Sequence, residues 1–455
     1  MPQDHQHAWT MLVGHFGAER MNGIASSRRR FASHLLPDLQ AAIVAEIAPF
    51  QAVLSGIHQP REFQALTISD LSIRNEDYAA AITPLQYQDV DVGGEEPFAA
   101  LNNGLWLFHV EDAPVAVLLS HYSDHFSMNR LAQVEIAYLP GLAALEFARA
   151  FLGSVQRAGE RSRLYRGKIL SFESGSDYSG MRADLLVHRL PQVERADVIL
   201  STQTMARLDR HVFEFDRHRA ELKRLGQSTR KGILLYGPPG TGKTHVIRYV
   251  SSSLPDHTTI LVTADQVKNL GKYMTLARTL EPSIVVLEDV DLIGRSREGM
   301  NSATTEALLN RLLNEMDGLR ADADILFILT TNRPEDIEDA LASRPGRVDE
   351  AIEVPLPDET CRARLIALYG KALRFEDGAV PDAVARSEGA SAAFVKEMVR
   401  RLAQRSLASA AGAEVLREDV AAVFGEATSN PSRLSRRIVG MDTRPRGRGD
   451  GDACC

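Results

Sequence analysis

The sequence predicts an α/β fold: a three-layer α/β/α domain with a parallel sheet, followed by a helical lid and preceded by a separate mixed α/β domain. Three features of the 455 residues support this fold class. Apolar strands alternate with helical segments over residues 196–357. One strand leads directly into a glycine-rich turn that opens a helix. From Asp358 to Phe424 the pattern is almost entirely helical.

The length suggests about three folded domains. We place their boundaries where composition and periodicity change along the chain. The predicted segments are a disordered N-terminus (1–33), a mixed α/β N-terminal domain of unknown role (34–195), the parallel-sheet domain (196–357), the helical lid (358–428) and a disordered basic tail (429–455).

The N-terminal domain carries strand and helix patterns but no chemical motif. Residues 104–110 and 113–119 are apolar and flank Glu111-Asp112, which predicts a β-hairpin. Helical spacing covers 35–54 and 141–155, and residues 134–138 alternate as a strand does. The scattered histidines of this domain lack the spacing of metal ligands, so we predict no metal site among them.

Composition argues against several classes of protein. The net charge is −8 and no basic stripe lies outside the tail, which disfavours nucleic acid as a partner. Cys361, Cys454 and Cys455 do not make a disulfide framework, which fits a reducing compartment. No window approaches 18 consecutive apolar residues, so we predict no membrane span and a cytoplasmic protein.

The most specific motif follows the apolar strand at residues 232–236. It reads Gly237-Pro238-Pro239-Gly240-Thr241-Gly242-Lys243-Thr244, with a helix predicted from His245. Glycines let backbone N–H groups converge on a polyphosphate, and the helix N-terminus adds its positive dipole end. Lys243 then reaches the β- and γ-phosphates and the Thr244 hydroxyl ligates Mg²⁺. The eight residues and His245 predict a P-loop that binds a nucleoside triphosphate with its metal.

Polar side chains follow two further strands of the predicted sheet. Glu288 and Asp289 end the β-branched strand that begins at Pro282, and Asn332 follows the strand at 327–331. In P-loop ATPases an acid at such a strand tip holds Mg²⁺, and the next acid polarises the attacking water. We therefore assign Glu288 to the metal, Asp289 to water activation, and Asn332 to a hydrogen bond with the water or the γ-phosphate.

Two arginines, Arg344 and Arg347, flank the turn Pro345-Gly346. A rigid guanidinium suits the neutralisation of developing phosphoryl charge. By composition alone, however, an exposed arginine without a partner is the favoured interpretation.

Together these motifs resemble the AAA ATPase module, from about Ile199 to Phe424, and residues 312–319 carry a further stretch typical of that family. The resemblance implies ATP and Mg²⁺ as cofactors, an α/β nucleotide-binding domain with a helical lid, and a hexameric ring. It implies that Arg344 and Arg347 act in trans on the ATP of a neighbouring subunit. It also implies nucleotide contacts from Ile199 and, near the adenine and ribose, from Gly389 and Ala390.

Three departures from the family pattern bear on function. The family usually ends its acidic strand Asp-Glu, whereas this chain has Glu288-Asp289. The segment 264–280 is short and offers only Asn269-Leu270-Gly271 where the family usually presents an aromatic pore loop. No His-Glu-x-x-His stretch follows the module, so we expect no fused zinc protease.

The sequence is compatible with three functions. The first is an ATPase that remodels a protein client, unidentified by the sequence, bound through the N-terminal domain. The second is a low-turnover nucleotide switch or scaffold, which the swapped acids and reduced pore loop favour. The third, nucleic-acid remodelling, is disfavoured by the acidic balance.

Overall fold

The computed structural model describes residues 7–58, 66–74, 79–124, 129–172, 185–263, 266–267, 270–292, 323–336, 348–408 and 413–429. The chain folds as two compact units, Met1–Arg189 and Leu190–Cys455. In these described ranges, no helix combines the length and the apolar character needed to cross a membrane.

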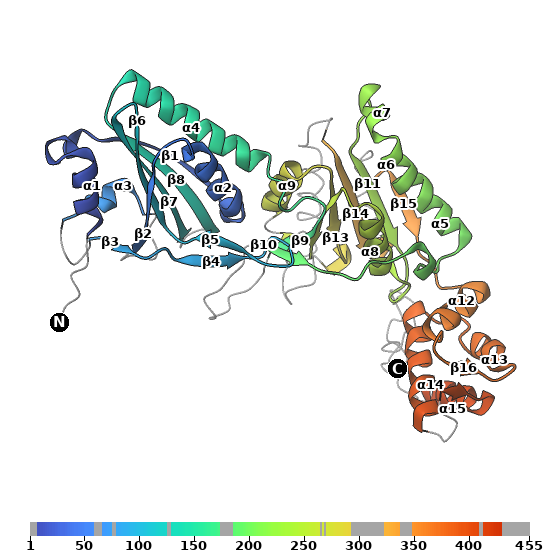
Figure 1. Ribbon diagram of the computed structural model, residues 1–455. Coiled ribbons are helices and arrows are strands. Elements are labelled where there is room, and N and C mark those ends of the chain that lie inside the picture. The colour runs from blue at the N-terminus through green and yellow to red at the C-terminus, as the bar shows by residue number, and fades with distance from the viewer. Residues whose placement is uncertain are drawn as a thin grey trace, which may run out of the picture. The chain divides into compact units, whose positions relative to one another are not determined.

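The first unit is built on a six-stranded antiparallel sheet (Figure 1). Its order is β1-β8-β7-β6-β2-β3. The strands are β1 (Ala25–Ala32), β2 (Val53–His58), β3 (Ala81–Thr83), β6 (Gly104–Val110), β7 (Ala113–Asp124) and β8 (Asn129–Tyr138). A separate hairpin joins β4 (Tyr87–Val90) to β5 (Phe98–Leu101).

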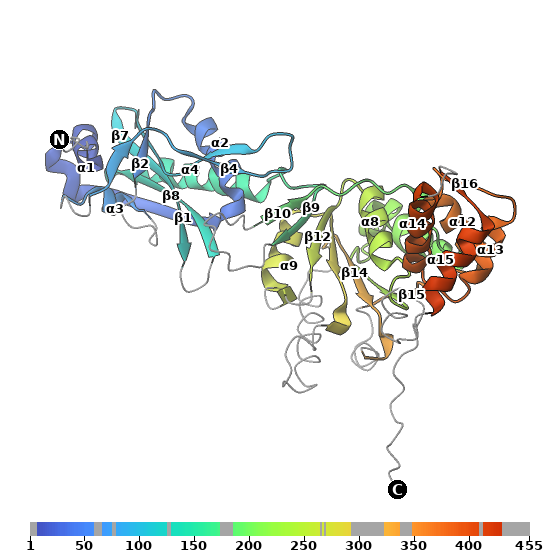
Figure 2. The ribbon, with the colours of Figure 1, turned by 90° about the horizontal axis from the view of Figure 1, so that it is seen from below.

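Helices cover both faces of this sheet because its strands alternate apolar side chains between the two faces. On β7, Val115 and Val117 join the core beneath α2 (Leu36–Ile47) and α4 (Leu142–Glu160). Ala116 and Leu118 join the core that includes α1 (Ala8–Phe16) and α3 (Ile68–Leu71). Figure 2 shows α1 and α3 together at one end of the sheet. Short 3₁₀ turns, Ala18–Gly23 and Ser33–Leu35, connect the elements before α2.

The expected disorder of the N-terminus is wrong for residues 7–33, which form α1, a 3₁₀ turn and β1. Ala8, Leu12 and Phe16 recur every fourth residue and are fully buried or nearly so. This stripe packs α1 on the sheet although the surrounding residues are rich in His and Gln.

The other predictions for this unit are largely confirmed. The hairpin turns at Glu111 and Asp112, whose φ angles of 49° and 66° are those of a tight primed turn. The strand at 134–138 lies in β8, and α4 extends the helix expected at 141–155. The helix expected over 35–54 is wrong beyond Ile47, because the chain turns there and enters β2 at Val53.

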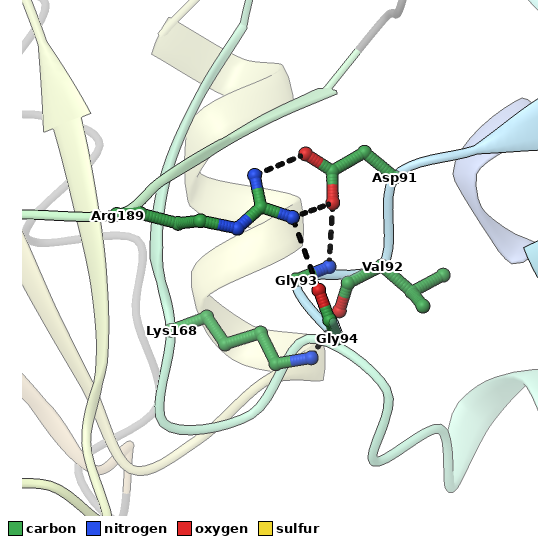
Figure 3. Close-up of polar contacts among 6 residues, drawn as sticks. All are labelled: Asp91, Val92, Gly93, Gly94, Lys168 and Arg189. Atoms are coloured by element: carbon green, nitrogen blue, oxygen red, sulfur yellow. Dashed lines mark hydrogen bonds and ion pairs between the residues drawn. The ribbon is translucent and has the colours of Figure 1, made fainter. Parts of the chain in front are cut away.

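Hydrogen bonds and an ion pair join residues 91–94 to the two residues that flank the antiparallel pair β9 (Ile169–Phe172) and β10 (Leu185–His188) (Figure 3). Arg189 donates two hydrogen bonds to Asp91, at 2.8 and 3.0 Å, and one to the Gly94 carbonyl. Lys168 donates to the Val92 carbonyl. Arg189 is 61% exposed, so its ion pair contributes no more than about 1 kcal/mol.

The second unit contains a parallel sheet with the order β12-β13-β14-β11-β15. Its strands are β11 (Lys231–Tyr236), β12 (Thr258–Val262), β13 (Ser283–Leu287), β14 (Ile325–Thr331) and β15 (Glu350–Glu353). β13 and β14 are buried along their whole length, as expected of strands covered on both faces. Because the strands are parallel, their carboxyl ends meet at one edge of the sheet.

Helices before and between these strands complete the unit (Figure 1). The core shared with the sheet includes residues of α5 (Thr202–Leu208), the π-helical turn Asp209–Glu214 and α8 (Lys243–Ser253). Short helices α6 (Phe215–Arg217) and α7 (Arg219–Arg224) lead into β11. Helix α9 (Leu270–Thr279) packs against β12 and β13.

After Pro357 the described residues are mainly helical, as the sequence predicts. It forms α12 (Glu359–Tyr369), α13 (Ala379–Arg386), α14 (Ala392–Ala408) and α15 (Arg417–Ser429), with a two-residue pairing of β16 (Arg374–Phe375) and β17 (Glu414–Val415). Asp358 caps α12 by accepting a hydrogen bond from the Cys361 N–H at 2.7 Å. Phe394, Met398 and Phe424 lie in the shared apolar core.

Candidate active site

The glycine-rich turn connects β11, which ends at Tyr236, to α8, which begins at Lys243. Gly237, Gly240 and Gly242 have φ angles of 146°, 76° and 106°, in a region that other residues rarely adopt. A Cβ at Gly237 would lie 2.3 Å from the Val354 carbonyl oxygen, so the loop also needs glycine for space. These residues therefore form the backbone cradle that a P-loop requires.

Lys243 points into this cradle and is only 7% exposed. Its Nζ donates to the carbonyl oxygens of Gly237, at 2.8 Å, and Pro238, at 3.0 Å. Burial lowers the pKa of Lys243 to about 8, while the charges of Asp289 and Asp291 act in the opposite direction. The loop thus holds a cation where the phosphates of a nucleotide are expected. Thr244, the second residue of α8, is exposed.

The acidic residues follow β13 at the same edge of the sheet. Glu288 is half-buried, and its N–H donates to the Val262 carbonyl at the end of β12. Asp289 has a φ of 49°, the left-handed conformation, which is uncommon for a residue with a side chain. Its N–H donates to Thr330 Oγ1 at 2.9 Å, and its Oδ1 accepts from Asn332 Nδ2 at 3.0 Å. Contacts from β14 thus support the strained conformation of Asp289.

A third carboxylate, that of Asp291, joins the end of β14 to the segment after β13. It is 6% exposed, and its Oδ1 accepts from Thr331 Oγ1 at 2.9 Å and from the Asn332 N–H at 3.1 Å. The sequence reasoning gave Asp291, Thr330 and Thr331 no role. The signal available was a pair of threonines ending one strand next to acids ending another.

A small pocket beside the P-loop gathers residues from several segments. It is lined by Ile199, Thr241, Cys361, Ala392 and residues 355–358. Burial raises the pKa of the Cys361 thiol to about 11, so the thiol is neutral. His245 Nε2 lies 3.2 Å from the Asp197 carbonyl oxygen, just before Ile199. The pocket therefore opens next to the phosphate cradle, and the candidate residue Ile199 is part of its wall.

Gly389 and Ala390 lie immediately before α14, whose start contacts the P-loop. Ala390 is fully buried in the helical core, and Gly389 has a φ of 69°. Three residues further on, the Ala393 N–H donates to the Gly240 carbonyl at 3.0 Å. The structure thus brings this segment to the glycine-rich turn.

Other candidate residues lie outside the described part of the chain. These are Arg344, Arg347, Asn269, residues 312–319 and the basic tail. Next to Asn269, Leu270 begins α9 and is fully buried. Tyr273 is 1% exposed, and its hydroxyl donates to Gln266 Oε1 at 2.7 Å. The aromatic residue nearest the expected pore loop is therefore a core residue.

The fold and this edge of the sheet define a P-loop nucleoside triphosphatase domain. Residues 233–356 match the family described as ATPase family associated with various cellular activities (AAA). This match assigns an AAA domain to that part of the chain.

Curated relatives agree with this assignment. The yeast mitochondrial inner membrane i-AAA protease supercomplex subunit YME1 is 32% identical over 219 residues, and the match covers 46% of this chain and 29% of that protein. The 26S proteasome regulatory subunit 8 of Caenorhabditis elegans is 36% identical over 38% of this chain and 44% of its own length. The proteasome-activating nucleotidase of Methanoregula boonei is 34% identical over 41% of this chain and 46% of its own. The chain thus spans less than half the length of each of these relatives.

Proposed function

We propose that this protein binds ATP with Mg²⁺ at the P-loop, hydrolyses it, and uses the cycle to remodel a protein held by its N-terminal unit. The observation that carries the proposal is the convergence of Lys243, Asp289 and Asn332 at the carboxyl ends of β11, β13 and β14. Ligands of open parallel sheets bind at this edge.

The residues present fit a magnesium-bound triphosphate. The positive φ angles of the P-loop glycines allow backbone N–H groups to converge on a phosphate, and the buried Lys243 ammonium favours an anion there. Thr244 and Glu288 supply the oxygen ligands that Mg²⁺ prefers. The metal would neutralise phosphate charge as it develops.

The protein's own groups account for the hydrolytic step. Asp289 accepts a proton from the attacking water, and Asn332 orients both the carboxylate and the water. Lys243 offsets the charge of the leaving phosphates. Arg344 and Arg347 would supply further positive charge from a neighbouring subunit of a homo-oligomeric ring, as the family resemblance implies. A cytoplasmic location is part of the same proposal.

A second candidate function is a nucleotide-dependent switch with negligible turnover. Two observations favour it: the order Glu288-Asp289 and the burial of Tyr273, which takes the nearby aromatic side chain out of reach of a threaded polypeptide. Steady-state phosphate release separates the two functions, because a switch gives release at background level.

Client capture tests the remodelling part of the proposal. Asp289→Asn should hold ATP without cleaving it and retain a client in a pull-down, whereas Lys243→Ala should fail to bind ATP and serve as the matched control. Proteins recovered equally with both variants would contradict ATP-dependent client binding.

A further inference from the structure

Strand β1 forms one edge of the N-terminal sheet as far as the structure describes it. It is the first strand in the order β1-β8-β7-β6-β2-β3 and pairs with β8 from Ala25↔Tyr138 to Ala32↔Leu131. In the part of the chain that the structure describes, no second strand pairs with it. In an antiparallel pair every second residue directs its N–H and C=O away from the neighbouring strand. Alternate residues of β1 thus present a row of backbone donors and acceptors.

Three consecutive arginines occupy this edge strand. Side chains of β1 alternate between exposed and half-buried, so Arg28 and Arg30 lie on one face and Arg29 on the other. Arg29 donates to the Leu152 carbonyl and the Gln156 amide oxygen on α4, both neutral acceptors. The edge therefore carries positive charge on both of its faces.

The Arg28 guanidinium is not neutralised by the residue opposite it on β8, because that carboxylate accepts hydrogen bonds from other groups. Arg28 lies opposite Glu135 in the register, and Glu135 is 1% exposed. The two Glu135 carboxylate oxygens accept from Ser26 Oγ, at 2.6 Å, and from the Ile68 N–H, at 3.0 Å. In the described part of the chain no ion pair joins Arg28 to any carboxylate.

We propose that an extended, acidic segment of a partner protein adds to β1 as a further strand. Backbone hydrogen bonds would supply the affinity of such strand addition, and Asp or Glu side chains alternating along the segment would meet the arginines. A second copy of β1 fits poorly, because antiparallel pairing would bring two runs of arginine together. Nucleic acid fits poorly as well, because its phosphate backbone cannot donate to the strand carbonyls.

That the partner segment belongs to the remodelled client rests on the proposed function. The binding of an acidic peptide to β1, however, is measured without nucleotide. The probe is a fluorescein-labelled peptide of four Glu-Val repeats, titrated with the full-length protein in an anisotropy assay. The matched peptide carries N-methyl groups on two adjacent central residues, which block both of its edges. We expect N-methylation and Arg28→Glu each to weaken binding about tenfold.

The control variant is Arg149→Glu, an exposed arginine on α4 in the same unit. It should bind the Glu-Val peptide within about twofold of the wild type. Phosphate release should be unchanged in both variants, because neither arginine belongs to the nucleotide site. Absence of ATPase activity in the wild-type protein would count against the proposed function alone, since peptide binding is measured separately. Absence of peptide binding would overturn the inference and leave the arginines as protection against edge-to-edge aggregation. Binding that responds to Arg28→Glu but not to N-methylation, or self-association through β1, would overturn it equally.

Discussion

The side-chain amide of Asn332 donates a hydrogen bond to Oδ1 of Asp289 across 3.0 Å. The two residues follow β14 and β13, which are neighbours in the parallel sheet. This contact joins the residue expected to activate water to the residue expected to orient it. Asp291 stabilises the same region by accepting hydrogen bonds from the Asn332 N–H and the Thr331 hydroxyl.

Asp289→Asn should abolish turnover and leave ATP binding intact. The substitution removes the base but keeps the size of the side chain, and general-base catalysis is worth about a hundredfold or more. Phosphate release measures the first effect and calorimetric titration with ATP the second. Turnover equal to that of the wild type would refute the assignment of Asp289.

Asp291→Ala should lower both stability and turnover. It leaves the Thr331 hydroxyl and the Asn332 N–H without their buried acceptor, at a cost of about 1–3 kcal/mol for each unsatisfied group. Asp291→Asn keeps an oxygen acceptor and should lose much less. Thermal unfolding and phosphate release compare the variants, and identical behaviour of Asp291→Ala and the wild type would contradict this role.

The lowered pKa of Lys243 predicts that the affinity for ATP depends on pH. Burial holds its folded-state pKa at about 8, below the usual 10.5. As pH rises through about 8 the free protein therefore loses the ammonium charge that the phosphates need, and ATP binding above that pH takes up a proton. The same shift makes the free protein gain stability between the folded and the unfolded pKa, because the unfolded chain holds the extra proton there.

Calorimetry in buffers of different ionisation enthalpy measures this proton uptake. Lys243→Arg is the control, because its guanidinium stays charged throughout this range. Affinity for ATP that is flat between pH 7 and pH 9.5 in the wild type would contradict the prediction.

Arg347→Ala should depress turnover while sparing ATP binding. An arginine supplied by a neighbouring subunit is worth on the order of a thousandfold in rate. If it acts in trans, wild-type activity rises more than linearly with protein concentration. A linear dependence across the range in which oligomers form would show that the arginine does not act between subunits.

The elements that sequence reasoning predicted well are those defined by local interactions. The P-loop requires glycines between one strand and the next helix, and the turn at Glu111-Asp112 joins two adjacent strands. β1 escaped prediction because its pairing partner, β8, lies more than a hundred residues away, as Ala25↔Tyr138 illustrates. Its three arginines fall in the segment predicted to be disordered, whereas the sheet places them on alternate faces.

The same reasoning applies to the candidate site. Lys243, Asp289 and Asn332 could be named from motif spacing, because the carboxyl ends of parallel strands meet at one edge. The motifs leave Asp291 without a role, because its role depends on its own hydrogen bonds to Thr331 and Asn332 rather than on a motif. Only the pairing of β13 with β14 brings these groups within hydrogen-bonding distance.

The most direct test of the account is steady-state phosphate release by the full-length protein with ATP and Mg²⁺, compared with Lys243→Ala and Asp289→Asn. The account predicts release well above background for the wild type and background release for both variants. Wild-type release at the level of the variants, or release that persists in both of them, would contradict ATP hydrolysis at this site.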